Sequence, residues 1–66
     1  MKQMILEAMQ IIDNMIAEYR KREKEIKKLY TDGKISNIEA VAFVTYIYEI
    51  IEKLEKTKKY LKSLKE

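Results

Sequence analysis

The chain contains no proline and only one glycine, Gly33, which lies close to its middle. Proline and glycine interrupt helices more strongly than any other residues, so this sequence holds few interruptions. Both sides of Gly33 are rich in Leu, Glu, Lys and Met, which favour helices. We therefore predict a single all-α unit over 1–66, a two-helix antiparallel hairpin. Its first helix spans about 2–31, its turn 32–35 and its second helix about 36–65.

Apolar residues recur in both predicted helices at spacings of three and four, as in a coiled coil. Each helix is apolar over a wide face in its first half, residues 4–19 and 38–54, and charged in its second half. In a folded hairpin, each wide half lies against a narrow, charged half of the same chain. Both wide faces then stay partly exposed, although a helix that is apolar over more than one stripe must be buried from more than one side.

A chain of 66 residues obtains only about 3–5 kcal/mol from its own core, so it needs a disulfide, a metal or a partner. It has no cysteine and no histidine, which leaves oligomerisation. We therefore predict a homodimer that forms a four-helix bundle. Turns at opposite ends and turns at the same end both satisfy the pattern, and a tetramer is a further alternative. The residues expected in the dimer core are Ile5, Ile12, Met15, Tyr19, Phe43, Ile47, Ile50 and Leu54.

Residues 31–39, Thr-Asp-Gly-Lys-Ile-Ser-Asn-Ile-Glu, resemble the second half of an EF-hand calcium loop. In that alignment Lys28 and Tyr30 stand where the first two carboxylates belong, and a lysine ammonium repels calcium. The same stretch also has a purely structural interpretation. Its glycine ends the first helix, and Ser36 with Glu39 forms a capping box for the second. We therefore predict a turn with a cap, and no metal or other cofactor.

The sequence contains no recognisable catalytic constellation. The commonest general base, histidine, is absent, and no Ser, Lys or carboxylate has a matching base beside it. We therefore expect a protein that is not an enzyme. The longest uncharged run, residues 40–48, is far shorter than the roughly 18–20 apolar residues of a membrane span. This favours a soluble, cytoplasmic protein without a membrane partner.

Charge is distributed in blocks along the chain, which carries a net charge of +3. The formal charge is −2 over 1–18, +4 over 19–28, −3 over 29–52 and +4 over 53–66. In a hairpin each basic block lies beside an acidic one, which indicates an ion-paired, solvated surface. The alternative is a nucleic-acid surface formed by segments 20–28 and 53–65. Its candidate phosphate-binding residues are Arg20, Lys21, Arg22, Lys24, Lys58, Lys59 and Lys62.

The second helix carries another apolar row, Ile38, Val41 and Tyr48. If Phe43 and Ile47 face the bundle seam, this row occupies outward positions, where a simple bundle has Lys or Glu. One interpretation is that the row packs near the turn against the first helix. The other is that an unidentified partner protein docks there with Tyr48 as its anchor, because exposed apolar surface often marks an interface.

In its length, its two long helices and its single tight turn, the chain resembles the small helical-hairpin homodimers typified by the Rop family of plasmid RNA-binding regulators. It also resembles adaptor-like hairpin proteins of archaeal spindle-shaped viruses. The resemblance covers the whole chain at the level of architecture and carries over no site residue. It implies either a small dimeric adaptor or regulator that binds proteins, our leading hypothesis, or a Rop-like nucleic-acid-binding regulator. Abundant Lys, Glu, Ile and Tyr adds a composition typical of thermophiles.

Overall fold

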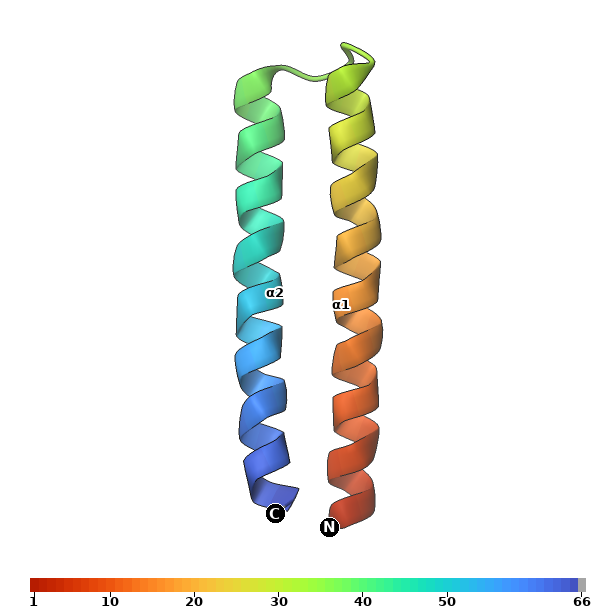
Figure 1. The fold of residues 1–66 in the computed structure, drawn as a ribbon, viewed down its shortest axis with the longest axis vertical. Coiled ribbons are helices and arrows are strands. Elements are labelled where there is room, and N and C mark those ends of the chain that lie inside the picture. Colours follow the sequence, from red (N-terminus) through yellow and green to blue (C-terminus); the bar gives the residue numbers. More distant parts are fainter. Residues whose placement is uncertain (66) are drawn as a thin grey trace.

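The computed structural model describes the backbone of residues 1–65 and the side chains of residues 1–64. Helix α1 spans Lys2–Thr31 and helix α2 spans Asn37–Lys65, and the two run antiparallel with both termini at the end opposite the turn (Figure 1). The predicted all-α hairpin is confirmed. The hairpin measures 48 × 15 × 10 Å, so it is a slab only one helix thick. Nothing in the part of the chain that the structure describes therefore covers the two broad faces of the hairpin.

The two helices meet along a seam of buried and half-buried residues that recur at spacings of three and four. This spacing keeps one stripe of each helix facing the other along its whole length. The seam residues of α1 are Ile5, Met9, Ile12, Ile16, Tyr19, Glu23 and Ile26. The seam residues of α2 are Ala40, Val44, Ile47, Ile51, Leu54, Lys58 and Leu61.

The seam within one chain does not coincide with the set of eight residues that the sequence predicted for the dimer core. In the single chain Ile5, Ile12 and Ile47 are buried in this seam, and Tyr19 and Leu54 are half-buried in it, whereas their place in a dimer core stays a prediction. The three other predicted core residues, Met15, Phe43 and Ile50, lie one position before the seam residues Ile16, Val44 and Ile51. Neighbouring positions are about 100° apart round a helix, so these side chains border the seam without filling it. Met15 is 41% exposed and Phe43 47% exposed in the single chain, and their burial in a dimer stays a prediction.

A Schellman motif ends α1. The backbone N–H of Gly33 donates to the carbonyl of Tyr30 at 3.0 Å, and the N–H of Lys34 donates to the carbonyl of Leu29 at 2.9 Å. This geometry needs a left-handed residue after the helix, and Gly33 supplies it with φ of 74°. The glycine near the middle of the sequence therefore lies where the chain reverses.

Replacing Gly33 with alanine is expected to lower the free energy of unfolding by about 1 kcal/mol, the cost of a left-handed backbone for a residue with a Cβ. A Cβ at this position meets no atom within 4 Å, so steric clash adds nothing. Urea unfolding followed by circular dichroism measures the change, and Lys34→Ala is the neighbouring control. An equal loss in both variants would show that the motif is not the cause.

A capping box begins α2, as predicted. The backbone N–H of Glu39 donates to Ser36 Oγ at 3.1 Å, and the N–H of Ser36 donates to Glu39 Oε1 at 2.9 Å. These bonds satisfy two donors that the helix itself leaves unpaired. The bond from the Ser36 backbone, followed by that from its side chain, lowers the pKa of the Glu39 carboxyl below its usual 4.5.

We expect Ser36→Ala to destabilise the protein by about 1 kcal/mol through loss of the cap. Calcium at millimolar concentration should leave both the helicity and the melting temperature unchanged. Thermal melts with and without calcium test both statements, with Ser63→Ala near the end of α2 as the control. A calcium-dependent rise in melting temperature that Glu39→Gln abolishes would restore the EF-hand interpretation.

Candidate interaction surfaces

The seam separates two broad faces of different chemistry. Asp13 and Met15 lie two residues apart on α1, as Tyr48 and Ile50 do on α2. Two residues correspond to about 200° round a helix, so the members of each pair lie on opposite sides of the seam. In an antiparallel hairpin, Met15 and Ile50 share one side, and Asp13 and Tyr48 share the other.

The first face is apolar and is called the apolar face below. A hollow at the open end of the hairpin joins Met1, Met4 and Ala8 of α1 to Leu64 of α2, which places both helices on this face. Further residues follow at heptad spacing and at neighbouring turns of the same helices. The apolar face consists of Met4, Ala8, Ile11, Met15 and Leu29 from α1 and Phe43, Tyr46, Ile50, Tyr60 and Leu64 from α2.

Most side chains of the apolar face are exposed in the single chain. Ile11 is 59% exposed and Tyr46 61%, so both leave apolar surface in contact with water. Charged residues interrupt the same rows: Glu18 and Glu25 follow Met4 and Ile11 at heptad spacing, Arg22 follows Met15, and Lys53 lies between Tyr46 and Tyr60. The guanidinium of Arg22 is 5.2 Å from the centre of the Tyr19 ring. This cation–π contact lets the stem of Arg22 cover apolar surface while its charge stays at the ring.

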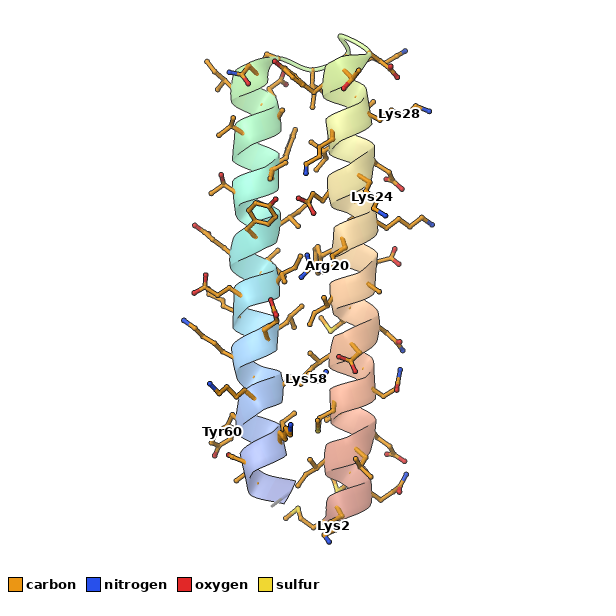
Figure 2. The ribbon with its side chains drawn as sticks, viewed as in Figure 1. Lys2, Arg20, Lys24, Lys28, Lys58 and Tyr60 are labelled. Carbon is orange, nitrogen blue, oxygen red and sulfur yellow. The ribbon has the colours of Figure 1, made fainter. Side chains whose placement is uncertain are left out.

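The second face, called the charged face, carries an ion pair and a hydrogen bond that cross the seam. Lys58 Nζ lies 2.7 Å from Asp13 Oδ1, and Figure 2 shows Lys58 between the two helices. Glu55 and Lys62 line the same shallow hollow as this pair. Both charges of the pair are partly exposed, so it contributes little to stability but helps to align the helices.

The most buried charged group of the described residues is the carboxylate of Glu23, which lies in the seam and is 9% exposed. The hydroxyl of Tyr48 donates to Glu23 Oε2 at 2.5 Å, and Lys27 Nζ lies 3.2 Å from the same oxygen. The hydrogen bond from Tyr48 is the main reason why the pKa of Glu23 lies below 4.5, with a smaller contribution from Lys27 against the opposing effect of burial. The same bond raises the pKa of Tyr48 above 10.0.

The predicted docking row is exposed in the single chain. Ile38 is 82% exposed, Val41 58% and Tyr48 50%. Val41 and Tyr48 border a shallow hollow of α2 beside the charged face, and Ile38 lies outside it. The hydroxyl of Tyr48 is already bound to Glu23 of α1. The packing interpretation therefore describes Tyr48 better, whereas docking at Ile38 and Val41 stays a prediction.

The candidate phosphate-binding residues are dispersed over the hairpin. Arg20 and Arg22 are two residues apart and so lie about 200° apart round α1, with Lys21 between them. In Figure 2, Lys24 points away from α2, whereas Arg20 and Lys58 lie near the seam at different heights. The last two candidates, Lys59 and Lys62, share their hollow with Asp13 and Glu55. No continuous basic stripe joins these side chains.

The hydrogen bond between Tyr48 and Glu23 and the ion pair between Lys58 and Asp13 were not foreseen from the sequence. Both pairs connect residues whose numbers have the same sum, as the register of an antiparallel hairpin requires. The sum is 71 in both pairs, whereas a turn centred on Gly33 alone gives 66, so the packing of the helices set the register that puts Glu23 opposite Tyr48. The acidic residue at a seam position of α1 was the signal for such a partner.

Within the described residues, no helix is long and apolar enough to cross a membrane, and no cluster of at least three His, Cys, Asp or Glu could bind a metal. No protein-family model matches the chain, and neither a characterised protein nor a solved structure matches it. The resemblance to Rop-type and viral hairpins therefore stays at the level of architecture. The functional argument depends on the surfaces described above.

Proposed function

We propose that this protein is a non-enzymatic protein–protein interaction module, a small adaptor or regulator that binds its partner through the apolar face. The observation that supports this most strongly is that apolar side chains from both helices share one face and remain exposed in the single chain. Exposed apolar surface of this extent on a small chain is typical of an interface.

The rows of the apolar face also indicate the kind of structure that fits them. Residues such as Met15 and Phe43 follow helical rows, and such rows accept the ridges of another helix. Met4 and Met15 add flexible thioether side chains, which adapt to a partner's shape. The dispersed basic residues, with Lys58 already paired to Asp13, support a nucleic-acid surface less well.

The proposal is tested by placing a photo-crosslinking amino acid at Phe43 in one variant and at Val41 in another. The two positions have comparable exposure, 47% and 58%, but lie on opposite sides of the seam. After irradiation in cells, we expect protein adducts from Phe43 and far fewer from Val41. Equal yields from both positions would contradict the choice of face, and adducts predominantly to RNA or DNA would contradict protein binding.

A further inference from the structure

The hairpin exposes more surface than a compact protein of its mass. Its accessible surface is 5406 Å², whereas a compact monomer of 7.9 kDa exposes about 4,400 Å². The excess is about 1,000 Å², close to the roughly 800 Å² that each partner buries in a standard stable interface. The chain therefore exposes about one interface more than a compact monomer does.

We propose that the occupant of the apolar face is a second copy of this chain. This inference rests on the proposed function, because it names the partner of the same face. The inner residues of the face lie at matching heights on the two helices, so they form successive layers at heptad spacing. These layers are Ala8 with Leu64, Met15 with Thr57, Arg22 with Ile50, and Leu29 with Phe43.

A second copy fits these layers for two physical reasons. Its own rows have the same spacing and the same 48 Å length, so two hairpins placed face to face stay in register from end to end. The layers also combine small residues, Ala8 and Thr57, with larger ones, Leu64 and Met15, which leaves room for side chains of the other copy. Two-fold symmetry then buries the same face on both chains.

Burial of this face also accounts for the thin core of the single chain. Its buried apolar residues are Ile5, Ile12, Ala40, Ile47 and Ile51, and none of the described side chains is completely enclosed. A second hairpin on the apolar face would enclose the layers beside this seam. The seam between two helices would then become part of a core between four helices. The charged face, with Tyr48 and Glu23, would remain on the outside.

The first test is the mass in solution, measured by light scattering and sedimentation from micromolar to millimolar concentration. The wild-type chain should show twice its mass of 7.9 kDa. Phe43→Lys should raise the dimer dissociation constant by about tenfold or more, because a lysine ammonium would replace a large apolar side chain in an interface layer. Val41→Lys, on the same helix but across the seam, should leave the constant unchanged.

The second test uses the absence of native cysteine, which lets a single introduced thiol report on its surroundings. Phe43→Cys should react with a maleimide more slowly as protein concentration rises, whereas Val41→Cys should react at a constant rate. Since Phe43 is 47% exposed and Val41 58% exposed in one chain, a large difference indicates cover by another molecule. Helicity measured on the same samples shows whether each variant is folded.

The outcomes separate this inference from the proposed function. A helical wild-type monomer at all concentrations would overturn the second copy, while the face itself would still be judged by the crosslinking experiment. A dimer in which Phe43→Cys reacts as fast as Val41→Cys would place the dimer interface elsewhere and overturn the second copy, and the crosslinking experiment would again decide whether the apolar face binds another protein. If Phe43→Lys is unfolded when dilute but helical when concentrated, folding is coupled to dimerisation and the inference is supported.

Discussion

Ile47→Asp is expected to unfold the protein at room temperature, whereas Ile38→Asp should leave it folded. Ile47 is 4% exposed in the centre of the seam, and Ile38 is 82% exposed on the same helix. A carboxylate at position 47 would be buried without a partner, which costs several kcal/mol. That cost matches or exceeds the roughly 3–5 kcal/mol that a core of this size supplies.

Circular dichroism and urea unfolding measure this effect, and Ile47→Val separates loss of volume from burial of charge. The smaller side chain should cost about 0.5–1.5 kcal/mol, as for other Ile→Val changes in cores. Ile12→Asp, at the buried seam position 8% exposed on α1, should repeat the result of Ile47→Asp. A cooperative wild-type melt for Ile47→Asp would mean that another stripe of α2 faces α1.

Tyr48→Phe is expected to lower the melting temperature at neutral pH. It should also reduce the loss of stability that the wild type shows as pH falls from neutral to acidic values. The hydroxyl of Tyr48 is the main reason why the pKa of Glu23 is lowered in the folded protein. A carboxyl whose pKa is lower when folded stabilises the protein at pH values above its unfolded pKa. This stability is lost as pH falls from about 4.5 through the folded pKa.

The control for this prediction is Tyr46→Phe, which removes a hydroxyl from a side chain that is 61% exposed on the apolar face. Melting temperatures between neutral and acidic pH should show the wild-type profile for Tyr46→Phe and a flatter profile for Tyr48→Phe. At alkaline pH the stability of the wild type changes in the opposite direction. The pKa of Tyr48 is raised above 10.0 in the folded protein, so the stability that its protonated hydroxyl contributes is lost as pH rises through the raised pKa. An unchanged acid profile for Tyr48→Phe would show that water replaces its hydroxyl on Glu23.

The sequence by itself determined the two helices, the turn and both helix ends at that turn. These features depend on residues close together in the chain. The Schellman motif joins Leu29 to Lys34, and the capping box joins Ser36 to Glu39. Local backbone preferences and short hydrogen bonds decide such features before any distant segment arrives, so a pattern of residue types is enough to predict them.

Only the tertiary structure decided which apolar row of each helix faces the other. Phe43 and Val44 are neighbouring apolar residues, about 100° apart round α2. Rotating α2 by that angle about its axis would place Phe43 in the seam and move Val44 out of it. The preference for Val44 is a sum over all contacts along the seam, including the bond between Glu23 and Tyr48, which are 25 residues apart. Because that sum depends on side chains from both helices at once, the seam and the uncovered apolar face beside it emerge only when the helices pack.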